Sequence, residues 1–149
     1  MSLAEQLDTD FKEALKGKVA EKLSILRMVR SNIKNLEITK QASASDEDIV
    51  EILQREVKQH GESIEANEKA GREEEVKRLQ EEVLLLKTYL PPELSNSELK
   101  DVVEGAIAEI NATTVSDLGK VMGKVMGQVK GRASGDEVGQ MVKDLLSSK

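Results

Sequence analysis

The sequence lacks several residue types on which common kinds of chemistry depend. It has no cysteine and no tryptophan, and its 149 residues include one phenylalanine, one tyrosine and one histidine. Without cysteine there can be no disulfide, thiolate nucleophile or cysteine metal site, and the lone His60 cannot supply a multi-histidine metal site within one chain. A core so poor in aromatic residues must be built from Leu, Val, Ile, Ala and Met, which suits helices packed side by side.

The chain also lacks the features of an exported protein. Its N-terminal segment, MSLAEQLDTDFKEALKGK, is amphipathic and carries acidic residues early. A secretory signal would instead place a basic region before an apolar run. We therefore expect a cytoplasmic protein without a membrane partner.

Acidic residues outnumber basic ones in this chain. There are 28 Asp and Glu against 22 Lys and Arg, for a formal net charge of -6, which argues against indiscriminate nucleic-acid binding. The segment from Asp117 to Ala133 departs from this balance, because it holds four cations and one anion. An anionic ligand should therefore prefer this end of the chain.

Apolar residues recur at helical spacing along the chain, and no segment shows the alternation typical of strands. Before the paired prolines this periodicity predicts four helices, with Gly17 capping the end of the first, Ser45 the start of the third, and Gly71 in the turn before the fourth. The expected ranges are about Ser2–Lys16, Ala20–Thr39, Asp46–Lys69 and Val76–Leu90. The last two should form a long antiparallel hairpin that Pro91 and Pro92 end.

Three shorter helices are expected after the prolines. Ser95 with Glu98, and Thr114 with Asp117, match the capping-box pattern, and Ser134 is suited to cap the last helix. The sequence therefore predicts an all-α fold with an N-terminal α-helical domain at residues 1–92, which contains the hairpin, and a small three-helix bundle at residues 93–149.

The middle helix of that second domain carries glycine at every fourth position, at Gly119, Gly123 and Gly127. On a helical projection these glycines lie roughly 140° from the centre of the apolar side, beside Lys120 and Lys124. Each glycine costs a helix about 0.5 to 1 kcal/mol relative to alanine, so the repeat needs a reason.

Three reasons for the repeat are open. Another helix could cross closely at the glycines, a phosphate backbone or partner chain could approach the exposed main chain there, or the glycines could simply be tolerated. A membrane dimer of the glycine-repeat type is excluded, because lysines interrupt every turn.

No catalytic constellation is visible in the sequence. The glycine repeat lacks the preceding strand and the spacing of a nucleotide-binding loop, and His60 lies on the apolar side of its expected helix, as a helix-interface residue would. We interpret the acidic residues near the start of the fourth helix as surface residues that face solvent and interact favourably with the helix dipole. They are Glu73, Glu74, Glu75, Glu81 and Glu82. We expect no autonomous catalysis, no metal and no cofactor.

A second basic stripe follows the expected second helix, at Arg27, Arg30 and Lys34. A solvated helix face is one interpretation of this stripe. A second contact for an anionic partner is the other.

Four segments of the chain match a family pattern. They are LSILRMVRSNIKNLEI (Leu23 to Ile38), ESIEANEKAGREEEV (Glu62 to Val76), YLPPELSNSEL (Tyr89 to Leu99) and DLGKVMGKVMGQVKGRASG (Asp117 to Gly135). Together they closely resemble the bacterial YqeY proteins over nearly the whole chain. The combination of LPxxLSxxEL with DxGKVMG and VKGRA is specific to that pattern.

The resemblance implies an accessory tRNA-binding protein. The second domain is similar to the C-terminal tail of the GatB subunit of the glutamine-dependent amidotransferase, a tail that helps to hold tRNA while other domains perform the chemistry. Kinship to a carbon-nitrogen ligase with glutamine as amido donor is therefore implied, without activity of the chain alone, and other amidotransferase or protein subunits are expected partners. The alternative is a helical module that docks a partner protein through the glycines.

By similarity, a set of basic residues and glycines is expected to contact the tRNA backbone. The basic residues would neutralise phosphates and the glycines would allow close approach, in recognition of RNA shape rather than of bases. The set comprises Lys120, Lys124, Lys130, Arg132, Gly119, Gly123 and Gly127.

Overall fold

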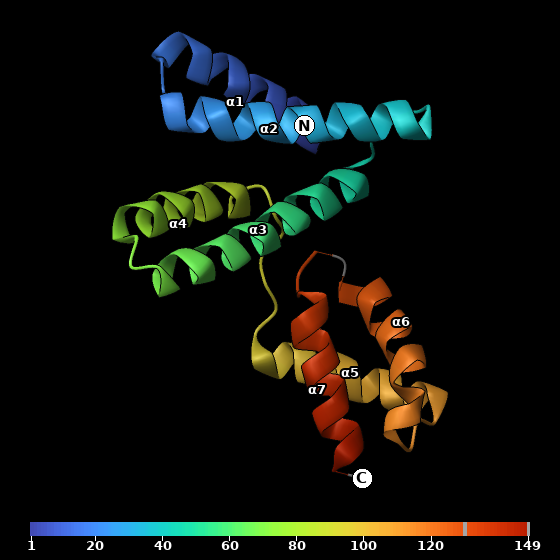
Figure 1. Cartoon of the computed structure of the whole chain (residues 1–149). Coiled ribbons are helices and arrows are strands. Elements are labelled where there is room, and N and C mark those ends of the chain that lie inside the picture. Colours follow the sequence, from blue (N-terminus) through green and yellow to red (C-terminus); the bar gives the residue numbers. More distant parts are fainter. Residues whose placement is uncertain (130, 149) are drawn as a thin grey trace. The chain divides into compact units, whose positions relative to one another are not determined.

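The computed structural model describes residues 1–129 and 131–148. The described residues form seven α-helices and one short 3-10 helix, with no strand among them, which confirms the all-α prediction (Figure 1). The helices are α1 (Leu3–Gly17), α2 (Ala20–Lys40), α3 (Asp46–Lys69), α4 (Glu73–Lys87), α5 (Asn96–Ile110), the 3-10 helix η1 (Val115–Asp117), α6 (Leu118–Val129) and α7 (Gly135–Ser147).

The chain divides into two compact units, Met1–Pro91 and Pro92–Lys149. Each unit has its own cluster of buried apolar residues. In the described part of the chain, no helix has both the length and the apolar character needed to cross a bilayer.

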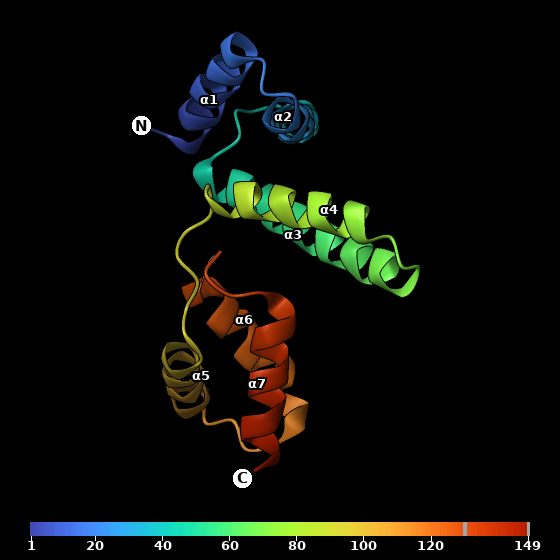
Figure 2. The same cartoon turned by 90° about the vertical axis from the view of Figure 1, so that its left-hand side faces the viewer.

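In the first unit, α1 and α2 lie side by side (Figures 1 and 2). The Ser2 hydroxyl accepts from the Glu5 amide, and the Glu5 carboxylate accepts from the Ser2 amide, which fixes the start of α1. The expected cap at Gly17 is wrong by one position. The left-handed residue is Lys18, with φ of 54°, and its amide donates to the last carbonyls of α1.

The pair α3 and α4 lies side by side and runs in opposite directions (Figure 2). Ser45 and Asp48 form a reciprocal capping box at the start of α3, and Gly71, with φ of 72°, makes the left-handed turn between the two helices. Leu53 of α3 and Leu86 of α4 are fully buried in the core of this unit.

The end of α4 comes earlier than the sequence suggests. The helix ends at Lys87, because the amides of Thr88, Tyr89 and Leu90 bond to carbonyls three residues earlier and tighten the chain before the prolines. The tightened turn places the Tyr89 hydroxyl to donate to Asp10 of α1. Burial, together with this bond, raises the pKa of Tyr89.

The second unit is built on one core that α5, α6 and α7 share. Ser95 caps α5 by accepting from the Glu98 amide at 3.1 Å, and Ser134 caps α7 by accepting from the Glu137 amide at 3.2 Å. The residues that close the core are apolar and small or branched; they include Leu99, Val103, Val121, Val125, Val138, Val142 and Leu146, each at most 2% exposed.

Candidate nucleic-acid interface

The start of α6 is fixed by Asp117. Its carboxylate accepts from the amides of Thr113 at 3.0 Å and Thr114 at 3.4 Å, and these bonds, with a smaller contribution from Lys120, hold the pKa of Asp117 below its usual value. The sequence predicted this cap, but it did not predict that Val115–Asp117 would form a 3-10 turn ahead of α6. The 3-10 turn leads directly into α6.

The rotation of α6 puts its valines inward and its glycines outward. Val121 and Val125 are fully buried and Val129 is 1% exposed. Gly119, Gly123 and Gly127, which we call the α6 glycine face, are all exposed. The sequence-based assignment of the two sides of this helix is therefore confirmed.

No other described segment of the second unit covers the α6 glycine face. Apart from its chain neighbours and the backbone of its own helix, a Cβ atom added at any of the three glycines would meet no described atom within 4 Å. No other described helix of the second unit therefore crosses closely at the glycines. Two reasons for the glycine repeat remain: another molecule approaches the helix there, or the helix simply tolerates the glycines.

The two lysines beside the face differ in their surroundings. Lys120 is exposed; it forms no ion pair with the described residues, and its charge helps to lower the pKa of Asp117. Lys124 is half-buried, with 32% of its side chain exposed, and its ammonium group pairs with the carboxylate of Glu109 on α5. Only the first of these cations is open to a ligand without displacing an internal partner.

Arg132 has a structural role in the second unit. Its Nε donates to the Pro92 carbonyl at 2.9 Å, its own carbonyl accepts from the Leu94 amide at 2.8 Å, and its Nη2 lies 3.9 Å from the Glu98 carboxylate. Gly131, with φ of 78°, makes the turn that allows this geometry. Arg132 thus ties the segment before α5 to the segment after α6, which its place in the sequence did not reveal.

Lys130, the remaining basic residue expected at this interface, lies outside the described residues. The structure therefore brings Lys120 and Lys124 to the α6 glycine face, while Arg132 is held by backbone and carboxylate partners.

The basic stripe of α2 lies in the first unit. Arg27, Arg30 and Lys34 are all exposed. Arg30 donates to Asp8 of α1 at 3.1 Å and lies over the Phe11 ring, 4.1 Å from its centroid, so it helps to join α1 and α2.

A buried polar cluster joins α2, α3 and α4. His60 is 8% exposed, its Nδ1 lies 2.9 Å from the Glu56 carbonyl oxygen, and its Nε2 lies 2.7 Å from the Glu82 carboxylate. Asn32 of α2 donates to Glu56 at 2.9 Å, and Arg78 donates to Glu82 at 2.7 Å. The helix-interface assignment of His60 is confirmed.

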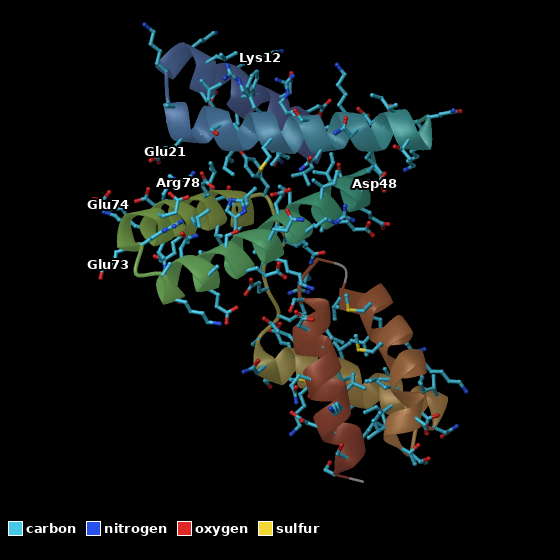
Figure 3. The ribbon with its side chains drawn as sticks, viewed as in Figure 1. Lys12, Glu21, Asp48, Glu73, Glu74 and Arg78 are labelled. Carbon is cyan, nitrogen blue, oxygen red and sulfur yellow. The ribbon has the colours of Figure 1, made fainter. Side chains whose placement is uncertain are left out.

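The surface assignment was wrong for one of the five acidic residues of α4. The Glu82 side chain is only 12% exposed, because it lies between His60 and Arg78. Figure 3 shows Glu73 and Glu74 at the outer end of α4, and Arg78 on the side of α4 where Glu21 of α2 also lies. The pKa of Arg78 is raised mainly by its bond to Glu75, and Glu82 and Glu21 act in the same direction.

The polar cluster of the first unit, formed by Asn32, Glu56, His60, Arg78 and Glu82, has the features of a hydrogen-bond network that holds helices together. No buried side-chain nitrogen or oxygen of the described residues lacks a hydrogen-bond partner. Nor do these residues gather three or more His, Asp or Glu side chains in a way that could hold a metal ion. The arrangement can bind helices together, and it presents no nucleophile next to a base.

Comparison with known families identifies the chain. The family model described as "Yqey-like protein" matches residues 4–146, which is nearly the whole chain. No curated protein matches the sequence. Because the family match spans both units, the chain belongs to the YqeY family.

Proposed function

We propose that this chain is an accessory tRNA-binding protein that holds RNA against the α6 glycine face and performs no catalysis alone. The observation that carries the proposal is the openness of this face: three glycines in register on an exposed helix surface, with no atom within 4 Å of any added Cβ. The resemblance of residues 93–149 to the three-helix tail of the GatB subunit supports the same assignment.

The physical basis is close approach combined with charge neutralisation. Glycines without side chains let a phosphate backbone come within contact distance of the helix main chain, and lysines beside them attract it. Lys120 is placed to act first, because it is exposed and has no ion pair among the described residues. Lys124 and Arg132 would add contacts after changing partners, and Lys130 completes the proposed set.

The basic stripe of α2 offers a second contact within the same proposal. Arg27 and Lys34 are exposed on α2, whereas Arg30 is engaged by Asp8 and Phe11. Reversal of Arg27 and Lys34 should therefore weaken RNA binding less than reversal of the cations beside the α6 glycine face.

The second candidate function is docking of a partner protein on the α6 glycine face. The observation that favours it is electrostatic: Lys124 is already paired with Glu109, and the chain carries a net charge of -6. A protein partner would give binding that depends weakly on salt. An RNA backbone would give strong salt dependence, with log affinity falling by about 0.7 to 0.9 per log unit of salt for each phosphate neutralised.

The test is equilibrium binding of total tRNA to the full chain across a salt series. A Lys120→Glu variant should bind about tenfold more weakly than the parent and with a shallower salt slope, because one phosphate contact becomes a repulsion. Lys143→Glu on α7 is the matched control, since it changes the net charge equally at an exposed residue of the same unit. Failure of the folded parent to bind tRNA at low salt would overturn the proposal, and equal losses in both variants would remove α6 from it.

A further inference from the structure

Carboxylates of α5 already engage cations of the proposed RNA-binding set. Glu109 pairs with Lys124, and Glu98 lies 3.9 Å from Arg132. Both carboxylates come from one helix, and both cations come from α6 or the segment that follows it. Two described cations of the set, Lys124 and Arg132, therefore lie next to carboxylates of α5.

The two ion pairs differ in how easily the cation can exchange its carboxylate for another anion. The Arg132 guanidinium also donates to the Pro92 carbonyl, so it changes partners less easily than Lys124. Lys124 pairs with Glu109, whose side chain is 62% exposed. Water can therefore solvate this carboxylate as soon as another anion takes the lysine.

We propose that Glu109 is a built-in competitor for the RNA backbone at Lys124, so that RNA binding requires exchange of a carboxylate for a phosphate. This inference rests on the proposed function. It assigns Glu109 a role in setting affinity and salt dependence without contact to any base. In the free protein Glu109 neutralises Lys124; in the complex it lies close to the phosphate that replaced it and repels it.

The size of the effect follows from the charges. A carboxylate about 6 Å from a phosphate in a water-like dielectric weakens binding by about threefold. Because the Lys124–Glu109 pair is neutral as a unit, it also lowers the effective number of phosphates neutralised by up to one. Removing the carboxylate should then steepen the salt slope by up to about 0.9.

The experiment compares Glu109→Gln with Glu104→Gln in the full chain, with total tRNA as the probe. Both variants remove one negative charge from α5, but Glu104 lies 3.9 Å from Lys100 on its own helix and does not pair with α6. We expect Glu109→Gln to bind tRNA about threefold more tightly than the parent at about 0.01 M salt and with a steeper salt slope, and Glu104→Gln to stay within about 1.5-fold of the parent.

The outcomes separate this inference from the proposed function. If the parent binds tRNA and the two variants behave alike, the competitor role of Glu109 is overturned while RNA binding stands. If the parent does not bind at low salt, the proposed function is overturned and the competitor role falls with it, whatever Glu109→Gln does. If neither binds while both remain folded by circular dichroism, both proposals fall.

Discussion

Replacement of the α6 glycine face by alanine should stabilise the fold and weaken RNA binding at the same time. Each of Gly119, Gly123 and Gly127 has open space where a methyl group would go, so alanine adds helix propensity without a clash. Gly123 lies in the middle of Leu118–Val129 and should contribute the full gain, about 0.5 to 1 kcal/mol in unfolding free energy.

The other two positions should contribute less, because Gly119 and Gly127 lie near the ends of α6, where fraying reduces the effect of propensity. The triple variant should therefore gain about 1 to 2 kcal/mol, or roughly 5 to 15 °C in the melting temperature of a unit of this size. Differential scanning calorimetry of the full chain measures the shift. Hydrogen exchange of α5, α6 and α7 amides assigns it to the second unit.

The same variant should bind tRNA at least about fivefold more weakly, which corresponds to about 1 kcal/mol, because three methyl groups separate the main chain from the phosphate backbone. Gly105→Ala is the matched control. Gly105 is an exposed glycine inside α5, also with no atom within 4 Å of an added Cβ, so alanine there should stabilise the unit without changing binding. If the triple variant gained stability but kept full tRNA affinity, the glycines would be merely tolerated and the reasoning would be refuted.

Two further predictions concern the polar groups that hold the helices. His60→Ala should lower the unfolding free energy by about 2 to 3 kcal/mol in urea titrations, because it leaves the largely buried Glu82 without one of its partners. The double change His60→Leu with Glu82→Leu should lower the unfolding free energy less than His60→Ala does. An equal or larger loss in the double variant would argue against the network. Asp117 has a lowered pKa, chiefly from the amides of Thr113 and Thr114, so its stabilising contribution is present above about pH 4 and is lost as the pH falls through the folded-state pKa. The melting temperature of Asp117→Asn should consequently fall less steeply than that of the parent between about pH 4 and pH 2.5, and parallel curves would contradict this assignment.

Local signals in the sequence predicted the helices well, since a cap acts within a few residues of the end that it fixes. Ser45 with Asp48 and the turn at Gly71 placed α3 at Asp46–Lys69, as observed. The end of α1 was missed because Lys18 adopts the left-handed conformation that glycine usually takes. A lysine that will adopt this conformation is hard to recognise from the sequence.

The parts of the site that sequence could not predict depend on contacts between distant residues. The apolar period of α6 correctly assigned its inner and outer sides, but it could not show that Glu109 pairs with Lys124, because that pairing depends on how α5 and α6 are rotated toward each other. Likewise, 40 positions separate Arg132 from the Pro92 carbonyl that it binds. In the sequence Glu82 resembles its exposed acidic neighbours, and only the packing of α3 against α4 places it beside His60.

An amide NMR titration of the full 15N-labelled chain with total tRNA tests most directly whether RNA binds the α6 glycine face. Amides of Gly119, Gly123 and Gly127 resonate in a region that few other residues occupy, so they can be followed individually. We predict that these signals and that of Lys120 shift or broaden at the lowest RNA concentrations, and that added salt reverses the change. Signals of α6 that stay unchanged while other regions respond, or no response at all from a folded chain, would contradict it.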